Sequence, residues 1–249
     1  MLTSQRRQTI VRWLQQHGGL HVAELSERLD VSPSTIRRDL QELARQGLIK
    51  RSYGGASLPA AGRELSPPNS LGEVEARIGR AVAALLIPGE TLFLAAGPMA
   101  LAVAHALSGR DDLTVITASL PAACHLAGHS QVELIVVGGL VNRESAAMAG
   151  HLAEQALEGL HADRLILGVQ GLTTPDGLTS DDLAQVRMAQ LLLQTVPEVI
   201  VVAEPSCLGR VCTARIAPVD RADVILTGHE APDAILWELA ELEIKVILA

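Results

Sequence analysis

The sequence is poor in aromatic residues, lysine and cysteine. Aromatic residues make up 2% of its 249 residues, charged residues 19% and hydrophobic residues 48%. A core with so few aromatic rings must be built from alanine, leucine and valine, which suits helices packed on a buried parallel sheet. The length leaves room for one large domain, or for one small and one medium domain.

The few cysteines favour reduced thiols over a structural disulfide, and their spacing does not favour a zinc site. Cys124, Cys207 and Cys212 form no CxxC pair and stand in no metal-binding spacing with histidine. We interpret them as reduced thiols of a cytosolic protein. The N-terminus has no apolar run of signal-peptide length, and no later stretch is long enough to cross a membrane. We therefore expect a soluble, cytoplasmic protein without membrane contact, metal or cofactor.

The charge is divided unevenly along the chain. Residues 1–58 carry nine Lys or Arg and five Asp or Glu, a net charge of +4, whereas the remainder carries −12. A basic head on an acidic body confines any contact with a polyanion to the head.

The most informative stretch is Ser32 to Leu43, SPSTIRRDLQEL. Ser32 is a good helix N-cap, Pro33 fits the first helical position, and the apolar residues that follow lie on one face. The opposite side carries groups that can bond phosphates or base edges, namely Ser34, Thr35, Arg37, Arg38 and Gln41. In isolation this could equally be a solvated surface helix.

The flanking segments favour DNA recognition. Residues 4–17 and 22–29 predict two helices, and a tight break separates the second from the helix that begins near Ser32. Two helices joined by so short a turn, the second one basic, form a helix-turn-helix arrangement. Residues 47–56 predict a β-wing that lays Lys50 and Arg51 along a phosphate backbone, with Tyr53 either in the wing contact or in packing.

The head resembles the winged helix-turn-helix of the DeoR-type bacterial transcriptional regulators. The likeness is carried by Arg6, Ile10, Leu14, Ser32, Thr35, Ile36, Arg37, Arg38, Asp39 and Leu40, followed by the wing KRSYGGA. It implies a regulator, expected to repress a sugar or carbohydrate operon, that binds operator DNA as a dimer or tetramer. The implied DNA-binding residues are Ser32, Ser34, Thr35, Arg37, Arg38, Gln41, Lys50, Arg51 and Tyr53.

The rest of the chain predicts a separate α/β domain. Residues 58–73 are rich in Pro, Gly and Ser and predict a linker between a DNA-binding domain over 1–57 and a body over 74–249. Strands are expected at 91–94, 113–116, 132–137, 164–169, 199–203, 224–226 and 245–248, with a loop over 170–179. Helices are expected at 74–86, 99–107, 120–127, 151–157, 183–194 and 234–239. Such repeated βα units predict an open, mostly parallel α/β sensor domain.

Several strands of the body end at glycines, which could form an anion-binding cleft or simply permit tight turns. Together these ends resemble the sensor domain of the same family, which is similar to ribose-5-phosphate isomerase and usually binds a phosphorylated sugar. The implied effector-binding residues are Ala96, Gly97, Pro98, Thr117, Ser119, Gly138, Gly139, Arg143, Gly168, Gln170, Glu204 and Ser206.

The body departs from the family pattern where a phosphate would be held. Residues 95–99, AAGPM, replace an acid and several hydroxyl residues, Ala189-Gln190 stands in place of a lysine-arginine pair, and Cys207 replaces a lysine. A phosphate needs hydroxyls and a cation in place of its hydration shell. A less charged effector, or no effector and constitutive DNA binding, therefore stays open.

A sugar-phosphate isomerase is the other alternative, and the lysine shortage disfavours it. Isomerisation needs a carboxylate base and an electrophile, and the only lysines, Lys50 and Lys245, are poorly placed for that role. Asp181 and Asp182 are more simply acids at a helix N-terminus. Glu204 would raise the pKa of the Cys207 thiol, which favours an idle thiol over a redox sensor. No catalytic residue is therefore assigned.

Overall fold

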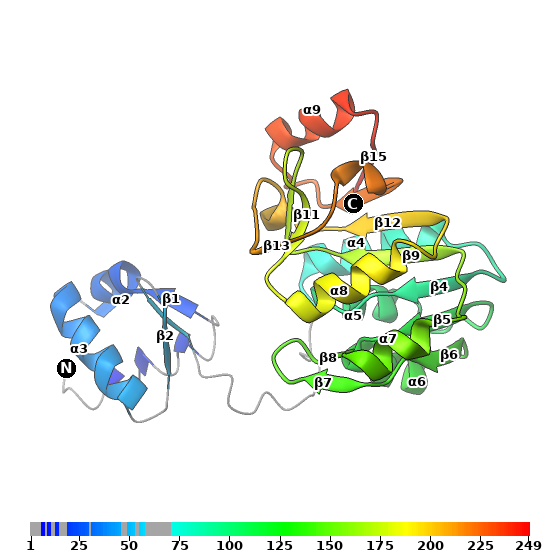
Figure 1. The fold of residues 1–249 in the computed structure, drawn as a ribbon. Helices are drawn as coiled ribbons and strands as arrows, with labels where there is room; N and C mark the ends of the chain where they lie inside the picture. The colour runs from blue at the N-terminus through cyan, green and yellow to red at the C-terminus, as the bar shows by residue number, and fades with distance from the viewer. Residues whose placement is uncertain are drawn as a thin grey trace. The chain divides into compact units, whose positions relative to one another are not determined.

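The computed structural model describes residues 6–7, 9–10, 13–14, 19–29, 31–45, 49–52, 55–57 and 71–249. The chain divides into two compact units, Met1–Glu64 and Leu65–Ala249, and each has its own hydrophobic core (Figure 1). Most of the predicted linker lies outside the described residues, so its bounds stay a prediction.

The N-terminal unit contains the predicted helices. α2 spans Val22–Leu29 and α3 spans Pro33–Arg45. Their apolar faces form one core with the first predicted helix, which is helical at each of its described residues. The core consists of Ile10, Leu14, Val22, Leu25, Ile36, Leu40, Leu43 and Ile49. The periodicity of the apolar residues therefore identified the buried face of α3 correctly.

The predicted wing is present as two antiparallel strands, β2 (Lys50–Ser52) and β3 (Gly55–Ser57). A third strand, β1 (Gly19–His21), pairs with β3, so the strand order is β1-β3-β2. The sequence analysis missed β1, because a three-residue strand beginning at the expected helix stop has no readable alternation.

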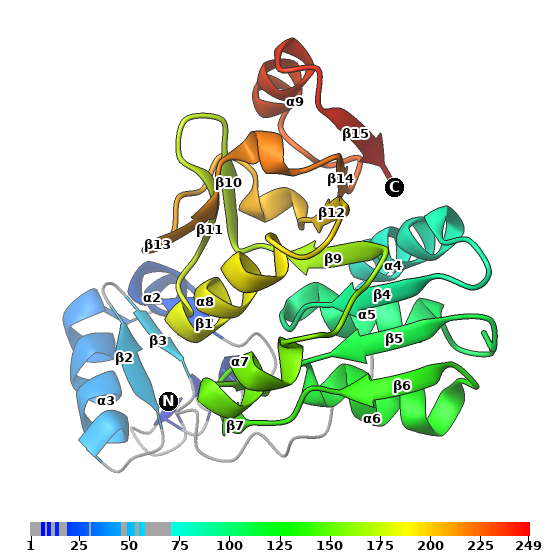
Figure 2. The same ribbon diagram turned by 45° about the vertical axis from the view of Figure 1, so that its right-hand side comes forward.

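The body is built on seven parallel strands. They are β4 (Thr91–Leu94), β5 (Thr114–Thr117), β6 (Glu133–Val136), β9 (Arg164–Gly168), β12 (Glu198–Val202), β14 (Val224–Thr227) and β15 (Lys245–Leu248). Their order is β15-β14-β12-β9-β4-β5-β6, and every neighbouring pair is parallel. Figure 2 shows β9, β4, β5 and β6 side by side. From β4 to β6 the chain adds successive strands toward one edge of the sheet, and from β9 to β15 it adds them toward the other edge. The switch point therefore lies between β4 and β9.

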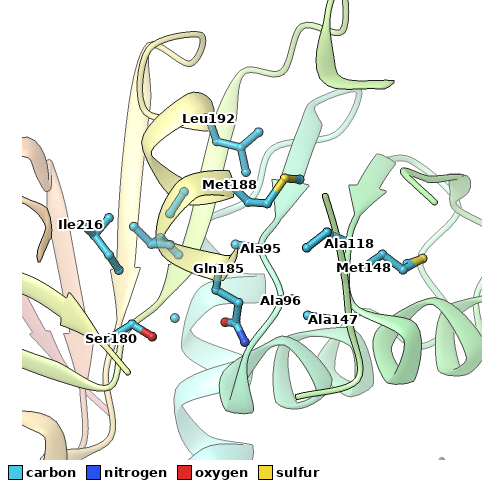
Figure 3. A pocket seen from close by; sticks show the side chains of 14 residues that line it. Ala95, Ala96, Ala118, Ala147, Met148, Ser180, Gln185, Met188, Leu192 and Ile216 are labelled. Carbon is cyan, nitrogen blue, oxygen red and sulfur yellow. The ribbon is translucent and has the colours of Figure 1, made fainter. Parts of the chain in front are cut away.

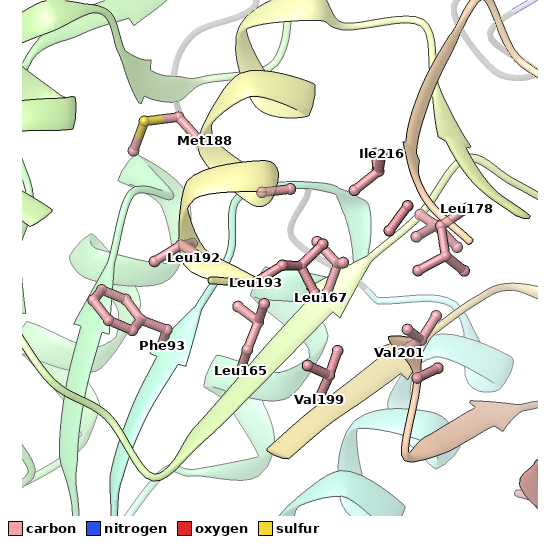
Figure 4. Close-up of a cluster of buried hydrophobic side chains, with 14 of the residues drawn as sticks. Phe93, Leu165, Leu167, Leu178, Met188, Leu192, Leu193, Val199, Val201 and Ile216 are labelled. Atoms are coloured by element: carbon pink, nitrogen blue, oxygen red, sulfur yellow. The ribbon is translucent and has the colours of Figure 1, made fainter. Parts of the chain in front are cut away.

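Helices cover both faces of this sheet because its strands are apolar on both faces. Leu92 and Leu94 of β4 face α4 (Glu73–Leu85), α5 (Pro98–Ala106) and α6 (Leu120–His129). Phe93, between them, faces the opposite layer, which holds α7 (His151–Leu157), α8 (Leu183–Leu192) and α9 (Asp233–Glu241). Figure 4 shows this second layer, with Phe93 of the sheet near Leu192 of α8. The α/β class and the seven strands follow the prediction, with ends shifted by one or two residues.

The predicted loop over 170–179 is wrong. It contains the hairpin β10 (Gly171–Thr173) and β11 (Gly177–Ser180), and β13 (Ala214–Ala217) extends it to a small antiparallel sheet. A second unpredicted ribbon joins β7 (Leu140–Asn142) and β8 (Ala147–Ala149). These strands have three or four residues each, so tertiary pairing decides their conformation rather than a local apolar pattern.

Three histidines lie together on α5 and α6. The rings of His105 and His125 stack at 3.7 Å between centroids, and those of His125 and His129 at 4.5 Å. Burial, followed by the charges of His105 and His129, lowers the pKa of His125 to about 4. In the described part of the chain, no group of three or more His, Cys, Asp or Glu side chains is arranged so that it could hold a metal ion.

This stack predicts a loss of stability in mild acid. The folded-state pKa of His125 lies below its ordinary value of 6.5, so the folded state takes up fewer protons than the unfolded state. Its contribution is complete above about pH 6.5 and is lost as the pH falls toward about 4. Allowing for solvent screening, His125→Gln should remove on the order of 1 kcal/mol of this pH dependence. Urea unfolding at pH 7 and pH 5 measures it, with exposed His161→Gln as the control. Equal pH dependence in both variants would contradict the expectation.

Candidate DNA interface and effector cleft

Ser32 lies directly before α3 and caps its N-terminus, as predicted. Its backbone oxygen accepts hydrogen bonds from Thr35 N at 2.9 Å and Ile36 N at 3.2 Å. Its hydroxyl lies 2.9 Å from the hydroxyls of both Ser34 and Thr35, and it accepts a bond from Thr35 N at 3.3 Å. The hydroxyls of Ser32, Ser34 and Thr35 therefore cluster at the positive end of α3, where a phosphate is favoured.

The outer face of α3 is open and basic. Ser34, Arg37, Arg38 and Gln41 are exposed, and Thr35 is half-buried. Within the described residues, no ion pair engages the guanidinium of Arg37 or Arg38. Side chains that can reach phosphates and base edges thus stand on one side of a helix whose other side forms the core.

Asp39 follows the two arginines in the chain but points into the unit, where its side chain is 3% exposed. Its carboxylate accepts hydrogen bonds from Arg6 Nε at 2.6 Å and from Arg7 Nε at 2.8 Å. The segment Arg37-Arg38-Asp39 therefore has two roles. The arginines form a basic pair on the outer face, and the aspartate anchors the N-terminal segment from inside the unit. The sequence analysis included Arg6 and Asp39 in the family signature but did not predict that they pair.

The predicted wing residues are only partly placed. Lys50 and Arg51 lie in β2, opposite Ser57 and Ala56 of β3. Tyr53 lies outside the described residues. The part of these three side chains in DNA binding stays a prediction.

A cleft opens at the carboxyl ends of β4 and β9, the switch point of the sheet. Open α/β sheets hold ligands at such a point. The space in this cleft that is open to the centre of a water-sized sphere is about 20 Å³. It is lined by Ala95, Ala96, Ala118, Ala147, Met148, Ala149, Leu167, Gly168, Ser180, Gln185, Met188, Ala189, Leu192 and Ile216. Figure 3 shows Gln185, Met188 and Leu192 of α8 on one side of this space, with Ala95 and Ala96 near Gln185. Of the predicted effector-binding residues, Ala96 and Gly168 line it.

Three other predicted effector residues have structural partners. The buried hydroxyl of Thr117 donates to the Leu94 oxygen at 2.8 Å and accepts from Ser119 N at 3.0 Å. Ser119 caps α6 by accepting a bond from Ala122 N. Gln170 Oε1 accepts bonds from Ser180 Oγ at 2.9 Å and from Asp181 N at 2.8 Å. These polar groups are therefore engaged within the protein, and the three residues do not line the cleft.

Four more predicted residues shape turns or begin helices near the strand ends. Gly97 caps α5 and Pro98 is the first residue of that helix. Gly138 and Gly139 have φ angles of 77° and 107°, and a Cβ at Gly139 would lie 2.7 Å from the Ala149 oxygen, so these positions favour glycine. Arg143 is exposed between β7 and β8.

Glu204 and Ser206 lie after β12, at the short helix η1 (Pro205–Cys207), and do not line the cleft. Burial and the nearby charge of Glu75 raise the pKa of Glu204. Burial raises the pKa of the Cys207 thiol, and Glu204 adds to this. A raised thiol pKa agrees with an idle thiol, although burial is the larger cause and the sequence analysis named only Glu204.

The acids before α8 separate into two roles. Asp182 Oδ1 accepts bonds from Ala184 N at 3.0 Å and Gln185 N at 3.2 Å, which confirms a helix N-cap. Asp181 directly precedes this cap at the helix N-terminus, and its carboxylate accepts a hydrogen bond from Thr213 N at 2.9 Å and pairs with Arg210 at 3.1 Å. The backbone N–H and hydroxyl of Thr213, with a smaller contribution from Arg210, lower the pKa of Asp181.

A winged helix-turn-helix unit with an open basic helix, followed by a parallel α/β domain, is the architecture of a DNA-binding transcriptional regulator. Comparison with known families agrees. Residues 6–61 match the DeoR-like helix-turn-helix domain, and residues 73–229 match the DeoR C-terminal sensor domain. The chain belongs to the DeoR family of transcriptional regulators.

Two relatives of known name match this chain over its whole length, and one solved structure matches part of it. The HTH-type transcriptional regulator GolR of Listeria innocua is 31% identical and covers 100% of both chains. The glycerol-3-phosphate regulon repressor of Escherichia coli is 30% identical, again over 100% of both chains. Ribose 5-phosphate isomerase A of Methanocaldococcus jannaschii matches 54% of this chain and 53% of its own, with 14% identity and a TM-score of 0.41. No helix in the described part of the chain is long and apolar enough to span a membrane.

Proposed function

We propose that this regulator is a repressor of a carbohydrate-metabolism operon and acts in the cytoplasm as a homo-oligomer. The name of the Escherichia coli relative, glycerol-3-phosphate regulon repressor, supports the choice of a repressor and of this kind of operon. The observation that carries DNA binding is the open face of α3, where Arg37 and Arg38 are exposed beside a hydroxyl cluster.

In this proposal α3 enters the major groove and the wing follows the backbone. Paired heads of an oligomer bind spaced half-sites, and an effector in the body shifts that spacing. The chain carries out no catalysis. The cleft is lined by no lysine and no carboxylate, so it offers neither the electrophile nor the base that an isomerase requires.

The proposal predicts strongly salt-dependent DNA binding. Each neutralised phosphate contributes about −0.9 to the slope of log affinity against log salt. An oligomer whose two heads each neutralise about two phosphates should therefore show a slope of about −3.6 or steeper on duplex DNA. The measurement is fluorescence anisotropy with a labelled duplex at salt concentrations from about 50 to about 200 mM. The double variant Lys50→Ala/Arg51→Ala removes the two wing bases that the proposal places along the backbone, so it serves as control and should give a shallower slope. A wild-type slope near zero would refute the proposed interface.

Constitutive binding is the second candidate, and one observation favours it. The lining of the cleft offers few polar side chains, Ser180 and Gln185 alone among its 14 residues. A regulator without an effector would bind duplex DNA equally in the presence of every small molecule tried.

A further inference from the structure

Resting on the proposed role of the body as a sensor, we propose that the cleft binds a small, uncharged molecule with an apolar skeleton and one hydrogen-bond donor. A phosphorylated sugar is the ligand that this cleft rejects. The proposal stands on the lining of the cleft, on one available acceptor, and on the position of a carboxylate behind that acceptor.

The lining provides no counter-charge for a phosphate. Apart from Ser180 and Gln185, its side chains are alanine, methionine, leucine and isoleucine, with one glycine. A phosphate that entered would lose its hydration and gain no cation in return, which is strongly unfavourable. An apolar skeleton, by contrast, would bury its surface against the same methyl and thioether groups with a net gain.

The hydroxyl of Ser180 is already used within the protein. Ser180 Oγ donates to Gln170 Oε1 at 2.9 Å and accepts a bond from Asp182 N at 3.2 Å. A polyol such as a free sugar would therefore find few partners for its many hydroxyls. This argues for an occupant with a single polar group.

Gln185 offers the acceptor that such a group would use. Its Nε2 donates to Asp182 Oδ2 at 3.1 Å, and this bond fixes the orientation of the amide. Its Oε1 lies 3.6 Å from the position of a Cβ placed on Gly97, the residue that follows the lining residue Ala96. A carbonyl oxygen in this place accepts from a hydroxyl or an N–H, and it repels a phosphate oxygen.

The charge behind Gln185 has the same sign as a phosphate. The carboxylate of Asp182 caps α8 through Ala184 N and Gln185 N, so it occupies those helix N-terminal groups and offsets their positive partial charge. An anion beside Gln185 would therefore face a carboxylate rather than the free N-terminus of α8. Two flexible lining residues, Met148 and Met188, can adapt to an uncharged occupant.

The test uses probe pairs that differ in charge. Benzyl alcohol and benzyl phosphate share one skeleton, toluene lacks the polar group, and glycerol 3-phosphate represents a phosphorylated polyol. With methyl-labelled methionine in the full chain, NMR follows the methyl signals of Met148 and Met188. Benzyl alcohol should shift both signals saturably, with an affinity at least ten times that of benzyl phosphate, and glycerol 3-phosphate should shift neither. Tighter binding of either phosphate would overturn the proposal.

Variants connect the signal to the named groups. Gln185→Met removes the acceptor at similar volume and should weaken benzyl alcohol several-fold while toluene binding is unchanged. Ala95→Leu places a larger side chain in the lining of the cleft and should weaken the binding of both benzyl alcohol and toluene. Ala127→Leu, at an exposed position of α6, should leave the binding of both probes unchanged. If no uncharged probe shifts Met148 or Met188 while duplex binding keeps its steep salt slope, the cleft proposal fails and the proposed DNA-binding function stands.

Discussion

Arg38→Ala is expected to weaken binding to a specific duplex about 5- to 150-fold, equivalent to about 1–3 kcal/mol. Arg38 is exposed on the outer face of α3, whose inner face is held by Ile36 and Leu40 at 0% and 1% exposure. The side chain can therefore be removed without disturbing the core. Arg37→Ala should behave in the same way if that side chain also reads a base edge.

The measurement compares two duplexes. One is selected from a random library by the wild-type chain, and the other is an unselected duplex of equal length. A base-reading arginine loses affinity mainly for the selected duplex, whereas a phosphate-binding arginine loses affinity for both equally. Arg28→Ala is the matched control, because Arg28 lies on α2 and pairs with Glu24 at 2.8 Å. Wild-type affinity in both Arg37→Ala and Arg38→Ala would remove α3 from the DNA interface.

The elements that could be predicted from sequence are those whose own residues decide their structure. Ile36, Leu40 and Leu43 repeat at helical spacing, and the seven sheet strands are short apolar runs between turn residues, so burial follows from local pattern. The strands β10, β11 and β13 could not be found in this way. They depend on pairing between residues 171–180 and 214–217, and Gly177 only marks the turn of the hairpin.

Of the properties of the cleft, only the lack of polar groups on one wall could be predicted from the sequence. The absence of hydroxyls in residues 95–99 is visible in the sequence, and Ala96 indeed lines the cleft. The opposite wall comes from Gln185 and Met188 of α8 and from Ile216 of β13, which lie far along the chain. Only the fold brings these side chains to the end of β4. Thr117 and Gln170 were predicted to bind the effector because they are polar residues at strand ends. In the structure their side chains form hydrogen bonds within the protein.

Asp39→Ala is expected to destabilise the N-terminal unit by about 3 kcal/mol. The substitution removes the common acceptor of Arg6 and Arg7, whose side chains are 11% and 30% exposed. Arg6 would then keep a charge in a nearly buried place without a partner, and this is where most of the loss arises. Because Arg7 can turn toward water, the loss of unfolding free energy should lie at the lower end of the range of about 3–5 kcal/mol that is typical of a broken buried ion pair. A unit of this size has few kcal/mol in reserve, so much of it would unfold at room temperature.

The two tryptophans allow this loss to be measured in the intact chain. Trp13 packs against the core of the N-terminal unit, and Trp237 of α9 is 73% exposed, so Trp237→Phe leaves Trp13 as the reporter at little cost. Urea unfolding in that background should show an early Trp13 transition for Asp39→Ala, with the helical signal of the body unchanged. Glu24→Ala breaks an exposed pair on the same unit, with side chains 38% and 43% exposed, and should cost less than about 1 kcal/mol. If Asp39→Ala costs no more than Glu24→Ala, Asp39 is not the anchor of the N-terminal segment. DNA binding lost together with the Trp13 transition would show that Asp39 acts by holding α3 in place.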